Sequence, residues 1–471
     1  MASPPTTVHR SPRPDVEIPD IPISTLVLGR ARERGDRPAL IDGSTGRTIG
    51  YGQLAEGVGR VAAGFAGAGL GPGDVVALCS ANVPEYVLAF HGVASAGGVT
   101  TTLNPLFTAE ELARQLQDSG ARFLIVGPGQ VEKGLEAAEG SAVEATFVLE
   151  GPSGGAGAGA AGSTTADGSG PVRSFQALLE AGGPAPEVSI DPRTDVAALP
   201  YSSGTTGWPK GVMLTHRNLV ANVVQMRQAD FVGAGEATVA QLPFFHIYGM
   251  QVLMNGVLAG GGTVVTMARF DFEEYLALLG RHGSRRAYVV PPILLALAKE
   301  PVVDRYGLAV EVVHSGAAPL GQEMGRACAE RLGCEVRQGY GLTETSPATH
   351  VFPPGLGMER CESVGPSVSR TDVRIVDIGS GEDLGAGEDG EVRVRGPQVM
   401  KGYLGHAEVT AECLDADGWL RTWDIGHVDD DGFLYVVDRL KELIKYKGYQ
   451  VAPAELEDVL LSHPAVSDAA V

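Results

Sequence analysis

The chain has 471 residues, enough for more than one hydrophobic core, because single cores stop growing at roughly 250 to 300 residues. Its formal net charge of −21 at pH 7 argues against nucleic acid or an anionic membrane surface as the main partner, since both require a basic face. The five cysteines are few, odd in number and lack the spacing of metal ligands. These features predict a protein of a reducing compartment, the cytoplasm, and not a disulfide-stapled scaffold.

Residues 1–23 are rich in proline and polar side chains and lack the apolar core of a secretory signal. We expect them to form a disordered tail. No later apolar run reaches about 18 residues, so the sequence predicts no membrane span.

Between residues 51 and 126 the hydrophobic periodicity alternates between helix-like and strand-like. The pattern predicts helices over 51–70, 83–97 and 108–120, and buried strands over 74–80, 99–103 and 122–126. Such alternation is typical of parallel sheets covered by helices, an α/β fold. Residues 151–170 contain too few large apolar groups to pack, and we expect a solvent-exposed loop there.

Beyond residue 371 the pattern changes to short strands, VRIVD, EVRVRG and FLYVVD, separated by turn signals. This pattern favours an antiparallel β subdomain over about 371–437. A basic stretch and a helical pattern over 454–462 follow. The sequence therefore predicts a large N-terminal domain over 24–438, made of two helix-covered sheets plus the β subdomain, and the start of a small α+β C-terminal domain over 439–471.

The stretch SSGTTGWPKG, residues 202–211, has the composition of a phosphate-binding loop. Gly204 and Gly207 let backbone N–H groups approach an anion, the hydroxyls add neutral donors, and Lys210 adds a positive charge. The spacing differs from the nucleoside-triphosphatase pattern G-x-x-x-x-G-K-[ST], because the two glycines are three apart and Pro209 precedes the lysine. Polyphosphate is the natural ligand, and a plain glycine-rich turn is the alternative.

Two further stretches carry chemistry that suits a nucleotide. Residues 338–344, QGYGLTE, offer an aromatic ring for a base, a hydroxyl for a phosphate oxygen and a carboxylate for Mg²⁺, with a structural turn as the alternative. Residues 438–450, DRLKELIKYKGYQ, concentrate cations in an acidic chain, with a solvated helix face as the alternative.

The order and spacing of the three stretches resemble those of the adenylate-forming superfamily. Within it the chain looks like an acyl-CoA synthetase and most resembles the 4-coumarate:CoA ligases, from about residue 37 to its last residue. The motifs that carry the resemblance are PYSSGTTGWPKGVMLTH, LPFFHIYGM, SGAAPLG, QGYGLTETSP, KGYL and VVDRLKELIKYKGYQVAPAELE. Several long motifs in register make a coincidence negligible.

The resemblance implies an ATP site built from all three stretches, with Mg²⁺ on Glu344 and coenzyme A as co-substrate. Asp424, helped by Arg439, would bind the ribose hydroxyls. The residues expected to hold the nucleotide, its phosphates or CoA are Ser202, Ser203, Gly204, Thr205, Thr206, Gly207, Lys210, Gly316, Ala317, Ala318, Gln338, Gly339, Tyr340, Gly341, Thr343, Asp424, Arg439, Lys445, Lys447, Gly448 and Gln450.

The resemblance also implies catalytic roles and a hinge. His246 would gate the pantetheine tunnel, with a packed core histidine as the alternative, and Lys441 would be the hinge of the small domain. The residues expected to act in the reaction are Lys210, His246, Thr343, Glu344, Lys445 and Gln450. The acyl group would contact Tyr248, Gly316, Ala317 and Gly341, although Tyr248 could instead be a core aromatic residue.

The implied chemistry consists of two half-reactions at one site. A carboxylate attacks the α-phosphorus of ATP to give an acyl-adenylate and pyrophosphate, and the CoA thiol then displaces AMP. A small carboxylic acid, ATP and CoA are the expected partners of a monomer or homodimer.

Two departures from the family pattern qualify this expectation. Trp423 precedes Asp424 where family members usually carry glycine, so an indole could crowd the nucleotide or shift the backbone. The family's catalytic lysine near the C-terminus has no counterpart, and we expect the sequence to be a fragment. Hydroxycinnamates are the favoured acids. A medium-chain fatty acid, transfer of the acyl group to a carrier protein, and an inactive nucleotide-binding homologue are the alternatives.

Overall fold

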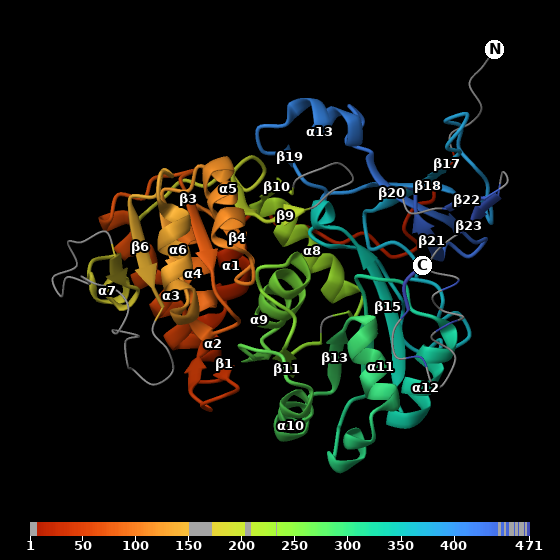
Figure 1. Cartoon of the computed structure of the whole chain (residues 1–471), viewed down its shortest axis with the longest axis horizontal. Coiled ribbons are helices and arrows are strands. Elements are labelled where there is room, and N and C mark those ends of the chain that lie inside the picture. Colours follow the sequence, from red (N-terminus) through yellow and green to blue (C-terminus); the bar gives the residue numbers. More distant parts are fainter. Residues whose placement is uncertain are drawn as a thin grey trace.

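The computed structural model describes residues 7–149, 172–202, 209–231 and 233–440, and near the end 444–446, 449–451, 456, 460, 466 and 469–471. Figure 1 shows the N-terminal strands and their helices at one end of the molecule and strands β17, β18, β20 and β21 at the other. Strands β13 and β15 with helices α11 and α12 lie between and below them.

The first sheet has nine strands in the order β19-β10-β8-β4-β3-β5-β6-β7, and β9 also pairs with β10. The central strands run parallel, as predicted, whereas β10 is antiparallel to β8, β9 and β19. The strands are β3 (Val75–Cys79), β4 (Val99–Leu103), β5 (Phe123–Val126), β6 (Ala145–Val148), β7 (Val172–Ser174), β8 (Val196–Leu199), β9 (Tyr201–Ser202), β10 (Lys210–Thr215) and β19 (Gly402–Tyr403).

Helices cover both faces of this sheet because alternate strand residues point in opposite directions. Val76 and Leu78 of β3 pack in one core with Phe65 of α3, whereas Ala77 and Cys79 pack in another with residues of α5 and α6. The helices of this part are α1 (Ile23–Leu28), α2 (Ala31–Arg34), α3 (Tyr51–Gly67), α4 (Pro84–Ser95), α5 (Ala109–Ser119), α6 (Val131–Ala138) and α7 (Gln176–Glu180), with a 3₁₀-helix at Pro128–Gln130.

The predicted mixed α/β class is confirmed, with several sheets in the described chain. The second layer is divided into two four-stranded sheets, β11-β12-β1-β2 and β13-β14-β15-β16. No ladder joins β11 to β13 in the described residues, and instead the side-chain amide of Gln241 donates to the carbonyl of Tyr288. The strands of these two four-stranded sheets are β1 (Pro38–Asp42), β2 (Thr48–Gly50), β11 (Ala237–Ala240), β12 (Thr263–Thr266), β13 (Arg286–Val289), β14 (Val312–Ser315), β15 (Glu335–Gly341) and β16 (Ala348–Val351).

The helices that pack on this second layer form the middle of the chain. They are α8 (His216–Gln228), α9 (Val257–Ala259), α10 (Phe272–His282), α11 (Pro291–Lys299) and α12 (Gln322–Leu332), with a π-helix at Gly249–Gly256 and 3₁₀-helices at Pro301–Arg305 and Thr343–Thr345. Helix α8 begins where the hydroxyl of Thr215 accepts a hydrogen bond from the N–H of Asn218, a standard N-cap.

An antiparallel four-stranded sheet lies where the sequence predicts short strands and hairpins. Its order is β17-β18-β20-β21. The elements are β17 (Asp372–Val376), β18 (Gly390–Arg395), α13 (Ala407–Cys413), β20 (Leu420–Val428) and β21 (Leu434–Arg439). A separate hairpin of β22 (Ile444–Tyr446) and β23 (Tyr449–Val451) follows.

The N-terminal segment differs from its prediction of disorder. From residue 7 it lies along the antiparallel sheet and the second layer, where His9 and Val373 exchange two 2.9 Å backbone hydrogen bonds. The guanidinium of Arg13 donates to the carbonyl of Val351 at 2.8 Å, and Ile18 is buried. These partners are some 340 or more residues away in the sequence, so local composition carries no signal for them.

Two sequence predictions fall on parts that the structure does not cover. The loop expected over 151–170 lies outside the described residues. The helix expected over 454–462 lies mostly outside them, and its two described positions, Leu456 and Leu460, are helical. Within the described chain, no helix combines the length and apolar character that crossing a bilayer requires.

Candidate active site

A cavity of about 320 Å³ opens where β9, the end of β14, β15, β19 and β20 meet. These elements come from parts of the chain more than 200 residues apart, so the fold assembles the cavity. The residues predicted for the site that line it are Ser202, His246, Tyr248, Gly316, Ala317, Gly339, Tyr340, Gly341, Thr343, Glu344 and Arg439.

Four other predicted residues have described surroundings but do not line the cavity. Lys210 is buried in β10, where it pairs in register with Ser202 of β9, so the two ends of the glycine-rich stretch lie side by side. Asp424 lies behind Tyr340. Ala318 is exposed, and the side-chain amide of Gln338 donates to the carbonyl of Cys361. The roles expected for these two residues remain predictions.

The remaining predicted residues belong to parts of which little is described. Lys445 and Gln450 stand opposite each other in the register of β22 and β23. The positions that lie outside the described residues are Ser203, Gly204, Thr205, Thr206, Gly207, Lys441, Lys447 and Gly448.

Tyr340, Asp424 and Arg439 form one linked group at the end of the cavity where β15 meets β20 and β21. The hydroxyl of Tyr340 donates to Oδ2 of Asp424 at 2.5 Å, and Nε of Arg439 lies 3.3 Å from Oδ1. The carboxylate is almost fully buried, whereas the Arg439 side chain is half exposed. Burial, and then the Asp424 charge, raises the pKa of Tyr340 well above its usual value, so Tyr340 stays a donor.

Glu344 and Tyr403 form a second buried pair on another wall. The hydroxyl of Tyr403 donates to Oε1 of Glu344 at 2.8 Å. Burial and the Glu344 charge raise the pKa of Tyr403, so this hydroxyl also remains protonated. Because β19 pairs with β10 through Val212 and Tyr403, the strand that carries Lys210 lies beside the strand whose Tyr403 binds Glu344.

Small residues keep the floor of the cavity open. A Cβ on Gly341 would lie 1.9 Å from the carbonyl oxygen of Pro347, which no side chain tolerates. A Cβ on Gly316 would lie 3.4 Å from the Tyr248 ring, and one on Gly339 would lie 3.4 Å from the Phe231 ring. Ala317 has a φ of 72°, in the left-handed region that favours glycine.

Aromatic residues close the other end of the cavity. Tyr248 and Phe231 line it, and His314 lies behind Phe231 with ring centroids 4.5 Å apart. His314 stacks on Tyr288 at 5.1 Å. In the described chain neither ring nitrogen of His314 nor the hydroxyl of Tyr248 has a hydrogen-bond partner, although all three are buried.

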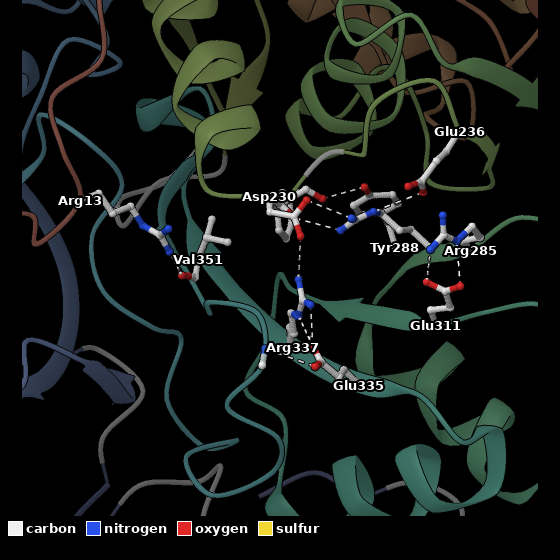
Figure 2. Close-up of polar contacts among 12 residues, drawn as sticks. Arg13, Asp230, Glu236, Arg285, Tyr288, Glu311, Glu335, Arg337 and Val351 are labelled. Carbon is white, nitrogen blue, oxygen red and sulfur yellow. Dashed lines mark hydrogen bonds and ion pairs between the residues drawn. The ribbon is translucent and has the colours of Figure 1, made fainter.

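A network of ion pairs fixes the backbone that carries Phe231. Asp230 forms an ion pair with Arg286 at 3.0 Å. It also pairs with Arg337 at 3.4 Å, and Arg337 pairs with Glu335 of the same strand (Figure 2). Tyr288 donates to the carbonyl of Phe231 at 2.7 Å. The network ties the loop after α8 to β13 and β15, so the aromatic wall is held by charges outside the cavity.

His246 lies on the cavity wall with an exposed edge. Its Nδ1 accepts a 3.2 Å hydrogen bond from the N–H of Tyr248, which sets the ring orientation. Protein atoms crowd the ring, and this desolvation lowers the pKa of His246, which favours a neutral imidazole near pH 7. The alternative of a packed core histidine does not fit a ring that faces the cavity.

The donor set suits a metal ion that is shared with a ligand. No cluster of three or more His, Cys, Asp or Glu side chains able to hold a metal occurs in the described part of the chain. Glu344 is a single buried carboxylate at the cavity. Mg²⁺ commonly takes one or two protein carboxylates and completes its shell with phosphate oxygens and water, so Glu344 fits that ion.

Comparison with known proteins decides the family. A family model described as AMP-binding enzyme matches residues 29–404. The chain belongs to the AMP-binding enzymes. A curated relative, 4-coumarate–CoA ligase 5 of Oryza sativa subsp. japonica, is 42% identical to this AMP-binding enzyme, with 98% of this chain and 84% of the relative covered.

Two solved structures have the same fold. A long-chain-fatty-acid-CoA ligase from Archaeoglobus fulgidus has a TM-score of 0.80 at 26% identity, covering 98% of this chain and 90% of its own. ATP-bound MatB from Rhodopseudomonas palustris has a TM-score of 0.81 at 28% identity, covering 96% of this chain and 85% of its own. The predicted fold class and the resemblance to adenylate-forming enzymes are confirmed.

Sequence reasoning missed several residues of this AMP-binding enzyme's cavity. Tyr403 belongs to the KGYL motif. The place of this motif among the other family motifs is the sequence feature that could have identified Tyr403. Phe231, His350 and Arg421 also line the cavity, and no motif marks them. They arrive there through tertiary packing alone.

Proposed function

We propose that this AMP-binding enzyme is an AMP-forming acid–thiol ligase that joins a carboxylic acid to CoA with ATP. The observation that supports it is the single cavity that collects Ser202, Tyr340, Glu344 and Arg439 from separate motifs. Its overall equation is the sum of two steps. The acid and ATP give acyl-AMP and pyrophosphate, and acyl-AMP and CoA give acyl-CoA and AMP.

In the first step the chain aligns two anions. The carboxylate is already ionised near pH 7, so no general base is needed, and the rate depends on orientation and charge neutralisation. Asp424 and Arg439 would hold the ribose, Tyr340 would pack on the base, and Thr343 would donate to the α-phosphate. Lys210 and the loop that begins at Ser202 would hold the β- and γ-phosphates.

Glu344 would bind Mg²⁺ together with phosphate oxygens. When bound, the ion supplies positive charge that offsets the developing charge on the leaving pyrophosphate. Tyr403 keeps the Glu344 carboxylate pointed at the cavity through its hydrogen bond.

In the second step the thiol of CoA attacks the acyl carbon and AMP leaves. His246, neutral and oriented by the N–H of Tyr248, would border the path by which the thiol enters. We further propose Lys441 as the hinge of the C-terminal segment. Lys445, Lys447, Gly448 and Gln450 would reach the adenylate or CoA as that segment rotates.

We propose a 4-coumarate-type acid as the substrate. The closed end of the cavity is aromatic, which suits a planar ring, and the buried hydroxyl of Tyr248 lacks a partner in the described chain. An unmatched buried hydroxyl rejects a ligand that lacks a complementary group more strongly than apolar walls reject a poor fit. The rice relative named 4-coumarate–CoA ligase supports the same choice.

The test is release of pyrophosphate and formation of acyl-CoA with 4-coumarate, cinnamate and octanoate. We expect 4-coumarate to be preferred over cinnamate, which differs only in the hydroxyl, and Tyr248→Phe to reduce that preference by about tenfold. A preference for octanoate would contradict the aromatic acid but not the ligase. Pyrophosphate release without any CoA dependence would favour transfer to a carrier protein. Silence with every acid would favour a nucleotide-binding homologue.

A further inference from the structure

Trp423 has a backbone conformation that costs free energy and that aromatic residues rarely adopt. It lies in β20 with a φ of 62°, and it is the one aromatic residue with positive φ among the described non-glycine residues. Such strain persists only where surrounding contacts impose it, and it concentrates at ligand-binding sites. Contacts with neighbouring residues must therefore hold Trp423 in this conformation.

Two contacts hold it. The guanidinium carbon of Arg421 lies 3.9 Å from the Trp423 ring centroid, so a cation covers one face of the indole. Arg421 is itself fixed, because its Nε lies 3.0 and 3.1 Å from the two carboxylate oxygens of the buried Glu391. The Trp423 carbonyl accepts a 2.8 Å hydrogen bond from the N–H of Leu440.

The held indole borders the nucleotide end of the cavity. Trp423 and Arg421 both line it, beside Arg439, and Trp423 directly precedes Asp424, which binds Tyr340. On the β21 side Asp424 remains in register with Arg439, whereas the register with β18 shifts between Arg421 and Ile425, on either side of Trp423. The large side chain is thus accommodated by the backbone conformation, and a cavity remains beside it.

We propose that Trp423 is a nucleotide-binding residue, whose indole packs against the adenosine part of ATP and AMP, and that Arg421 is the positioning residue that holds the ring. This inference rests on the proposed function, since it assumes that the nucleotide occupies this end. Stacking of a base on an aromatic side chain changes affinity by roughly 5- to 150-fold when the ring is removed.

The test measures AMP binding to the full chain by calorimetry, together with KM values for ATP and for the acid. Trp423→Asn keeps a residue that tolerates positive φ but removes the ring, and it should weaken AMP binding and raise KM for ATP about tenfold while KM for the acid stays within twofold. Trp423→Phe keeps an aromatic ring, so its AMP affinity and its KM for ATP should stay within about threefold of the parent values. The AMP affinity and the KM for ATP of Arg421→Met should lie between those of Trp423→Asn and Trp423→Phe.

Trp419 provides a matched control. Its ring also stacks on an arginine, Arg395 at 4.5 Å, but it is buried and does not line the cavity. Trp419→Phe should leave AMP binding unchanged. With Trp208 replaced by Phe, AMP should change the indole fluorescence of the parent protein, and this change should persist in Trp419→Phe and vanish in Trp423→Phe.

The outcomes separate this inference from the proposed function. Equal or tighter AMP binding by Trp423→Asn, with a normal melting temperature, would mean that the indole only crowds the site and would overturn the inference alone. A parent protein that binds no AMP and releases no pyrophosphate would overturn both. A loss of AMP binding that Trp423→Phe largely restores supports the inference.

Discussion

The Tyr340 hydroxyl and the Asp424 carboxylate lie 2.5 Å apart although 84 residues separate them in the chain. The bond joins β15, a strand of the second layer, to β20 of the antiparallel sheet. Both groups belong to the proposed ATP site, so the bond fixes the carboxylate that would bind the ribose before any ligand enters.

Replacing Tyr340 with Phe should therefore weaken nucleotide binding more than it slows chemistry. A hydrogen bond to a charged group contributes roughly 1.5 kcal/mol or more, so we expect KM for ATP to rise about tenfold with kcat within threefold. Steady-state kinetics with ATP as the varied substrate measure both. Tyr435→Phe is the control, because Tyr435 also contacts an aspartate, Asp429, but outside the cavity. A drop in kcat alone would contradict this role.

Glu344→Gln should remove most of the activity and its dependence on Mg²⁺. The amide keeps the shape and can still accept from Tyr403, but it does not supply the negative charge that the proposed ion requires. We expect kcat/KM to fall about 100-fold or more. Tyr403→Phe should lower kcat/KM only about fivefold, because the Glu344 carboxylate remains. A Mg²⁺ titration of the initial rate distinguishes the two, and Glu362→Gln at an exposed position is the control.

The sequence predicted local elements well because hydrophobic periodicity records which face each segment buries. Helices α3, α4 and α5 and strands β3, β4 and β5 all lie within their predicted ranges. The break between β11 and β13 was not predicted, because strand pairing depends on how helices seat the two sheets. No local pattern records that.

For the site, motifs placed the residues and tertiary packing supplied their partners. Tyr340 and Glu344 line the cavity as expected, but their hydrogen bonds to Asp424 and Tyr403 are long-range, and no local pattern predicts which residues pair. Trp423 has a positive φ and lies at a shift of the β18–β20 register, and its effect on nucleotide binding remains a prediction. Localisation in the cytoplasm and the monomeric or homodimeric state remain predictions, because the fold of one chain bears on neither.

Arg13 should contribute to stability through the N-terminal segment that was expected to be disordered. Its guanidinium is partly buried and donates to the carbonyl of Val351 in β16. Arg13→Ala leaves that buried carbonyl without this donor, and we expect the free energy of unfolding to fall by about 1 to 3 kcal/mol. Arg10→Ala, at an exposed position of the same segment, should change it by less than about 0.5 kcal/mol. Urea unfolding followed by fluorescence measures both, and equal effects would contradict a specific contact.

The stability of the protein should fall in mild acid because of buried neutral histidines, of which His91 and His350 are two. Burial lowers the pKa of His91 to about 3 and the pKa of His350 to about 3. In the unfolded chain each would take up a proton below its ordinary pKa of about 6.5, while the folded chain would not. The unfolded state then binds more protons, so stability decreases as pH falls from about 6.5 toward 3.

The size of the effect follows from the same linkage. At pH 5 each of these histidines should lower the free energy of unfolding by about 2 kcal/mol relative to neutral pH. Each pH unit below the unfolded-state pKa corresponds to about 1.4 kcal/mol. Urea midpoints between pH 5 and pH 8 should therefore drop steeply at the acid end, and His91→Gln should flatten that slope. A His91→Gln profile that is parallel to the parent profile would show that His91 is protonated in the folded protein as readily as in the unfolded one.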